Sequence, residues 1–226
     1  MSTLLELCNL AAAECTYPSL GTAQNQTGQR ADMVRWVKET WMEVQRAHRN
    51  WNWMRDEFSF TTTASQQAYT PTDAAPTGAA LTRFRQWHID TLRCYLTSTA
   101  DEQWMVFQPY IKFRDRYMFG SVPSSRPMDF SIRPRDKALL FGNIPDQVYT
   151  ITGEYQKSSL ALSADADEPD MPDEFHHIIV YGAMRKYAHA ENAPEVEARG
   201  LEGWNRMMGE LVADQLPPVE FGDPLA

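Results

Sequence analysis

The chain has 226 residues, of which 43% are hydrophobic and 23% are charged, a composition that is typical of folded proteins and excludes disordered and fibrous ones. Its formal net charge is −9, and residues 160–226 hold 14 acidic against 4 basic side chains, which disfavours conventional nucleic-acid binding because that requires a basic surface. No run approaches the roughly 18 apolar residues of a membrane-spanning helix, and no signal peptide is expected because the first residues lack a basic region.

Two helices and then two strands are predicted in the first third of the chain. Apolar residues repeat at helical spacing in residues 4–15, and Pro18 then ends the segment. A longer amphipathic pattern follows in residues 32–50. The period changes to strict alternation in residues 58–62 and again in residues 67–70, on either side of a polar link, which predicts a β-hairpin.

Strands predominate in the middle of the chain, and helices return towards its end. Short β-type runs occupy residues 91–96, 128–133, 138–141 and 148–155. A short helix is expected at residues 108–117, and an acidic loop with two prolines follows the last strand at residues 160–172. Apolar spacing then predicts a third helix around Phe175 and a fourth from Pro194 to about Ala213.

These elements predict an α+β fold in which both ends of the chain build one helical bundle. The bundle would contain about four helices from residues 1–56 and 172–214, with an antiparallel β-rich insertion at residues 57–171 and an extended tail at residues 215–226. Four aromatic residues flank the point where the chain first leaves the bundle and enters the insertion. We expect their side chains to seal the bundle against the insertion. They are Trp51, Trp53, Phe58 and Phe60.

The sequence contains no Walker loop, GxGxxG or GxSxG motif, so no catalytic residue and no cofactor are predicted. Asp165, Asp167, Asp170 and Asp173 resemble a calcium-binding loop, but Pro169 stands where a ligand should be, and the central glycine and closing glutamate are missing. The histidines at 176, 177 and 189 lack the spacing of a metal site, and so do the three cysteines. No metal is predicted.

Two alternatives to a structural role remain open. RFRQW at residues 83–87 and KFRDRY at residues 112–117 interleave basic and aromatic side chains as a surface for single-stranded nucleic acid does, although nearby acidic residues dilute both. A polymer-degrading hydrolase would need only carboxylates that meet in the folded chain, which a sequence does not exclude. The absence of any catalytic motif favours a structural protein that is not an enzyme.

Four local patterns resemble the head-to-tail adaptor, or connector, proteins of tailed bacteriophages, particularly those of podoviruses. They are LLELCNLAAAEC at residues 4–15, WNWMRDEFSFTTTASQQAYTP at 51–71, RPMDFSIRPRDKALLFGNIPDQVYTITGEYQKS at 126–158 and LALSADADEPDMPDEFHHIIVYGAMRKYA at 160–188. The last is the most distinctive, because an acidic loop that ends in Met-Pro and continues as Asp-Glu-Phe-His is an unusual way to begin a helix. None of the four is a catalytic signature.

The resemblance implies a virion structural protein. Members of that family form a ring of about twelve copies beneath the portal, connecting the capsid to the tail around the channel through which the DNA leaves. The implied partners are the portal protein, tail or nozzle proteins and further copies of the chain, while DNA would pass without specific binding and no membrane would be involved. The implied location is the head–tail junction of the virion, after synthesis in the host bacterial cytoplasm.

The tail is expected to bind the portal or a neighbouring subunit, because its prolines forbid a helix and its few apolar residues cannot form a core of their own. The predicted anchoring residues are Leu216, Pro217, Pro218, Val219, Phe221 and Leu225. No long apolar stripe is left over once the four predicted helices pack. We therefore expect the isolated subunit to be a monomer that forms the ring only on the portal.

Overall fold

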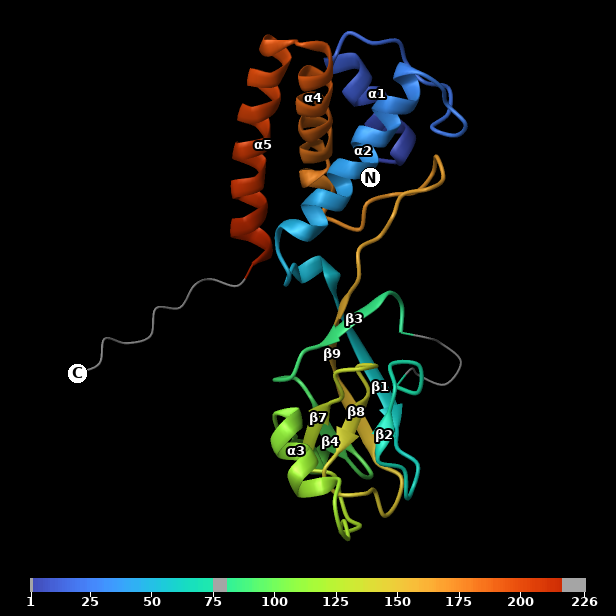
Figure 1. Cartoon of the computed structure of the whole chain (residues 1–226), viewed down its shortest axis with the longest axis vertical. Coiled ribbons are helices and arrows are strands. Elements are labelled where there is room, and N and C mark those ends of the chain that lie inside the picture. The colour runs from blue at the N-terminus through green and yellow to red at the C-terminus, as the bar shows by residue number, and fades with distance from the viewer. Residues whose placement is uncertain (1, 75–80, 217–226) are drawn as a thin grey trace, which may run out of the picture. The chain divides into compact units, whose positions relative to one another are not determined.

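Figure 1 shows a computed structural model of the chain, which describes residues 2–74 and 81–216. The chain divides into two compact units. The helical unit contains the residues up to Met54 together with those from Ser159 onward, and the β unit contains Arg55–Ser158. The boundaries predicted from the sequence were after residues 56 and 171. Residues 159–171 belong to the helical unit because the acidic loop is hydrogen-bonded to its amino-terminal helix, through Leu4 N to Asp167 O and Leu5 N to Asp165 O.

The helical unit contains the four predicted helices, which are α1 (Leu4–Glu14), α2 (Gln29–Ala47), α4 (His177–Glu191) and α5 (Pro194–Gln215). Helix α4 packs against each of the other three, and α5 lies alongside it in Figure 1. Thr3 caps α1 in a capping box with Glu6, and Pro194 occupies the first turn of α5, where its missing N–H costs no hydrogen bond. Two single turns of 3₁₀-helix, Asn52–Met54 and Asp173–Phe175, complete the unit.

The core of the helical unit is centred on the apolar faces of these helices. Its largest fully buried side chains include Trp41, Trp51, Leu4 and Leu7. Cys8 and Cys15 are buried in the same core, and burial raises the pKa of each thiol to about 12. A thiol with so high a pKa is almost entirely protonated at neutral pH, so these cysteines act as small core residues.

The β unit is built from two small sheets. The first has strand order β1-β9-β4-β5, and β3 also pairs with β9; the second has order β2-β8-β7-β6. The strands are β1 (Arg55–Thr61), β2 (Ala68–Tyr69), β3 (Phe84–Trp87), β4 (Arg93–Tyr95), β5 (Gln103–Trp104), β6 (Val106–Phe107), β7 (Asp129–Ile132), β8 (Leu139–Phe141) and β9 (Thr150–Lys157). The pairs are antiparallel except β6 with β7, which is parallel.

The β unit has a separate, largely aromatic core. Phe58, Phe60, Tyr69, Phe130 and Phe141 meet there, between the two sheets. Helix α3 (Tyr110–Tyr117) packs against β7, and a single 3₁₀ turn covers Thr99–Asp101. Helical ends with strands between them confirm the predicted α+β class, including the bundle of about four helices.

The predicted β-hairpin at residues 58–70 is wrong. Strand β1 pairs along its whole length with β9, from Arg55 opposite Gln156 to Thr61 opposite Thr150, whereas β2 pairs with β8 in the other sheet. Alternation in the sequence located both strands correctly but could not choose their partners. A seven-residue strand finds more hydrogen bonds with the eight-residue β9 than with the two-residue β2.

Candidate functional site

The acidic loop is a structural clamp on the amino-terminal part of the helical unit. The Asp165 carboxylate accepts hydrogen bonds from the Thr22 hydroxyl at 2.6 Å and the Ala23 N–H at 2.8 Å. Asp167 Oδ2 accepts bonds from the N–H groups of Ser163 and Ala164, at 2.6 Å and 2.8 Å. Both carboxylates therefore accept hydrogen bonds from N–H and O–H donors of the chain. The spacing of the aspartates in the sequence did not reveal this structural role.

His176 joins the amino terminus, the acidic loop and α4. Its side chain is buried, its Nδ1 accepts a bond from Ser2 N–H at 3.2 Å, and its Nε2 lies 3.0 Å from Met171 O. Because a carbonyl only accepts, Nε2 donates a hydrogen bond to Met171 O in this contact. Within residues 2–74 and 81–216, no group of three or more His, Cys, Asp or Glu side chains is arranged to hold a metal ion.

The clamp makes the helical unit sensitive to acid. Its hydrogen bonds, led by that from Thr22, lower the pKa of Asp165, so the folded carboxylate stabilises the protein above the ordinary aspartate pKa of about 3.9. That stability is lost as the pH falls through the lowered value. We expect the unfolding temperature, followed by circular dichroism, to fall from pH 5 to pH 3, and to fall less steeply for Asp165→Asn. Glu202→Gln, on an exposed position of α5, is the control, and an unchanged slope for Asp165→Asn would contradict the assignment.

The four predicted junction residues lie as two pairs, one in each unit. Trp51 and Trp53 stack with their ring centroids 4.4 Å apart, and the Trp51 indole N–H donates to Val44 O at 3.0 Å. Phe58 and Phe60 lie on β1 in the aromatic core of the β unit, with centroids 6.1 Å apart. The pairs stand on either side of the unit boundary at Met54 and Arg55.

Only Leu216 among the predicted tail anchors falls within the described residues. It ends α5, donates its N–H to Val212 O at 3.1 Å and packs, partly buried, against the helical core. The other five, Pro217, Pro218, Val219, Phe221 and Leu225, lie outside the described residues.

The basic and aromatic motifs are placed unfavourably for nucleic-acid stacking. Trp87 is 4% exposed and donates its indole N–H to Lys137 O at 2.7 Å, while Phe113 and Tyr117 are 1% and 6% exposed. Stacking on bases requires exposed ring faces. Both motifs supply core aromatic residues to the β unit, which argues against the single-strand-binding alternative.

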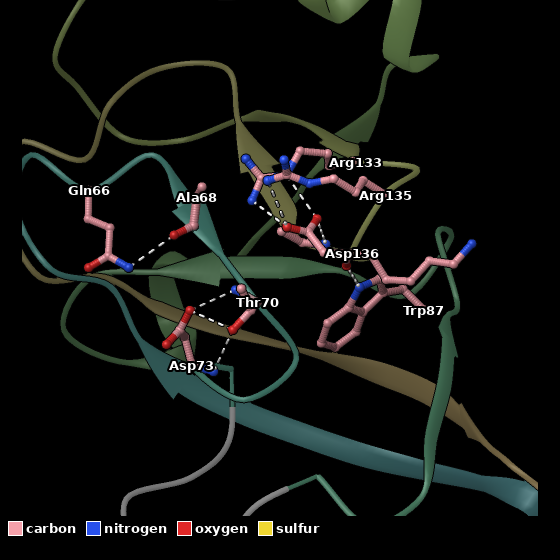
Figure 2. Close-up of polar contacts among 10 residues, drawn as sticks. Gln66, Ala68, Thr70, Asp73, Trp87, Arg133, Arg135 and Asp136 are labelled. Carbon is pink, nitrogen blue, oxygen red and sulfur yellow. Dashed lines mark hydrogen bonds and ion pairs between the residues drawn. The ribbon is translucent and has the colours of Figure 1, made fainter.

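Figure 2 shows how a tight turn after β7 uses its charged residues. Arg133 forms a two-pronged contact with the Asp136 carboxylate at 2.8 Å and 2.7 Å, and Arg135 lies 3.8 Å from the same group. These contacts lower the pKa of Asp136 to about 2. The general acid of a glycoside hydrolase needs a raised pKa, so Asp136, like Asp165 and Asp167, lacks the property that this one role requires.

Five of the large apolar side chains that are exposed fall between residues 104 and 119, in the β unit. Trp104, Val106, Ile111 and Phe119 are between 54% and 68% exposed, and Met118 is 42% exposed. Exposed apolar side chains gathered in one region commonly mark surfaces that another protein covers. Their positions near strand and helix ends gave no periodic signal in the sequence.

Nearly the whole chain is similar to one family of known proteins. None of the helices in the described part is both long and apolar enough to cross a membrane. A search of curated proteins gives no match. One family model, described as SU10 adaptor protein, matches residues 2–220 and so extends over both units. This protein therefore belongs to the SU10 adaptor protein family.

Proposed function

We propose that this protein is a head-to-tail adaptor of a tailed bacteriophage, of the podovirus type. In this role it forms a ring beneath the portal, connects the capsid to the tail and surrounds the channel through which DNA leaves. The observation that carries the proposal is the family match over residues 2–220, which supports a structural adaptor role and a place in the virion. Virion assembly then explains why the polar clusters described above serve packing and turns instead of catalysis.

The division into two units supports a subunit with several partners. A ring subunit needs two unlike faces that close on each other, and it also needs contacts above and below the ring. The helical and β units each have a core of their own, so each is equipped to hold a separate binding surface. The exposed apolar segment from Trp104 to Phe119 is our candidate for the contact with tail or nozzle proteins. We propose that the chain segment joining the units is held at its ends by four aromatic residues, Trp51, Trp53, Phe58 and Phe60.

The distribution of charge supports passage of DNA without specific binding. Residues 55–158 carry 12 basic and 11 acidic side chains, so the negative charge of the chain belongs to the helical unit. Each phosphate contact with a cation strengthens binding to DNA and would slow its movement. We propose that the helical unit contributes an acidic surface near the channel.

The proposed function is tested by mixing the purified full chain with the portal protein of the same phage. Analytical ultracentrifugation should show a monomer for the chain alone, and a complex with about twelve copies when portal rings are added. Negative-stain images should show the added density as a ring on one face of the portal. The proposal is wrong if the chain does not bind portal rings, and ring assembly on the portal is wrong if the chain alone forms a stable ring.

A second arm of this experiment tests the tail. Deleting residues 217–226 leaves every described contact of the helical unit in place, so folding should be unchanged while binding to portal rings weakens. Phe221→Ala should reproduce part of the loss, about fivefold, because a buried aromatic anchor commonly contributes more than about 1 kcal/mol. Equal binding of the truncated and full chains would contradict the role of the tail.

A further inference from the structure

A groove of about 470 Å³ lies within the helical unit, lined by residues of α2, α4 and α5. Its two aromatic walls are Trp36 on α2 and Trp204 on α5, and Gly182 on α4 also lines it. The absence of a side chain at Gly182 lets α4 approach α2 and α5 closely at the groove. A Cβ atom at this position would lie 2.2 Å from Thr40 Cγ2 of α2 and 2.8 Å from the Trp204 ring.

The charges in the groove leave Arg185 available to a ligand. Two of the groove's three carboxylates, on Glu39 and Glu43, lie 3.7 Å and 2.5 Å from Lys186 Nζ and share its single charge, and Glu197 on α5 supplies the third. Arg185 instead lies over the Trp204 ring, with its Cζ 5.5 Å from the ring centroid. Across the described part of the chain, no carboxylate forms an ion pair with Arg185. A guanidinium beside an indole face fits a ligand with a carboxylate next to an aromatic ring.

One segment of this chain has that chemistry. Residues 219–223 read Val-Glu-Phe-Gly-Asp, so Phe221 is flanked by two carboxylates within two positions. Leu216 caps the end of α5, and Phe221 is five residues further on, so an extended chain would carry it roughly 17 Å from that end. A helix is about 10 Å across, so this length is enough to pass from one subunit to the next in a ring.

We propose that the groove between α2, α4 and α5 receives the tail of a neighbouring copy, with Phe221 against Trp204 and Glu220 or Asp223 paired with Arg185. This inference rests on the proposed ring, because it requires neighbouring copies. It identifies the helical unit of the next subunit, and not the portal, as the partner of the tail. The contact is head-to-tail, since the tail and the groove are different surfaces of the same chain, and it is therefore suited to closing a ring.

The test uses the full chain without portal, so its failure is distinguishable from failure of the adaptor role. A fluorescein-labelled peptide with the sequence of residues 216–226 is titrated with the protein, and fluorescence anisotropy gives the dissociation constant. We expect saturable binding that Arg185→Glu weakens at least about fivefold, the factor that corresponds to about 1 kcal/mol. Arg206→Glu is the matched control, because Arg206 lies exposed on α5 and does not line the groove. It should change the dissociation constant less than about twofold.

Variants of the peptide leave the folded protein untouched and keep the test decisive even if Arg185→Glu does not fold. A peptide with Glu220→Arg and Asp223→Arg should bind the natural chain at least about fivefold more weakly. Against Arg185→Glu, the same peptide should recover affinity. Absence of binding, equal losses for Arg185→Glu and Arg206→Glu, or indifference to the charges of the peptide would each overturn the proposal.

Discussion

Replacing Gly182 with valine is expected to lower the free energy of unfolding of the helical unit by about 3 kcal/mol. A side chain at this position would overlap Thr40, which is fully buried, and the Trp204 ring on the opposite side. Thr40 has no exposed surface into which its side chain could withdraw, so the overlap would push α4 away from α2. Overpacking of a close helix contact is among the largest effects that a single substitution produces. The change is measured by urea unfolding followed by circular dichroism.

Gly209→Val is the matched control, because Gly209 also lies inside a helix but has open space where a Cβ would stand. Valine there should change the free energy of unfolding by less than about 0.5 kcal/mol, since its helix propensity is at least as good as that of glycine. A loss of similar size at both positions would mean that the effect comes from the helix backbone and not from packing at Gly182.

Trp51→Ala is expected to destabilise the helical unit by about 4 kcal/mol. The side chain is completely buried, stacks on Trp53 and donates a hydrogen bond to Val44 O, so its removal leaves a large cavity and an unpaired carbonyl. Differential scanning calorimetry should show the unfolding transition of the helical unit at a much lower temperature.

Trp104→Ala provides the comparison for Trp51. Trp104 is 60% exposed, and its ring contacts Arg93, whose Cζ lies 4.8 Å from the ring centroid. Its loss should cost less than about 1 kcal/mol, the usual worth of an exposed cation–π contact. If both substitutions destabilise the protein equally, the burial of Trp51 is not what makes it important.

The sequence determined the elements best where a single local rule governs them. Helices α1, α2, α4 and α5 were predicted because apolar residues at helical spacing, together with signals such as Pro18 and Pro194, act over one or two turns. Four local patterns in the sequence also resemble an adaptor family. The SU10 adaptor protein match over residues 2–220 agrees with that resemblance at the level of a phage structural adaptor.

Only the tertiary structure decided which strands pair and what the polar residues do. Alternation placed β1 and β2 but could not bring β1 to β9, because strand pairing depends on contacts nearly a hundred residues apart. Likewise, the spacing of Asp165 and Asp167 resembled a calcium loop, whereas the folded chain turns both carboxylates towards hydroxyl and N–H donors. The groove beside Gly182 was equally hidden, since it arises where three helices that are separate in sequence meet around a residue without a side chain. Local periodicity can be read from the sequence, but packing of the folded chain determines which distant strands and side chains come into contact.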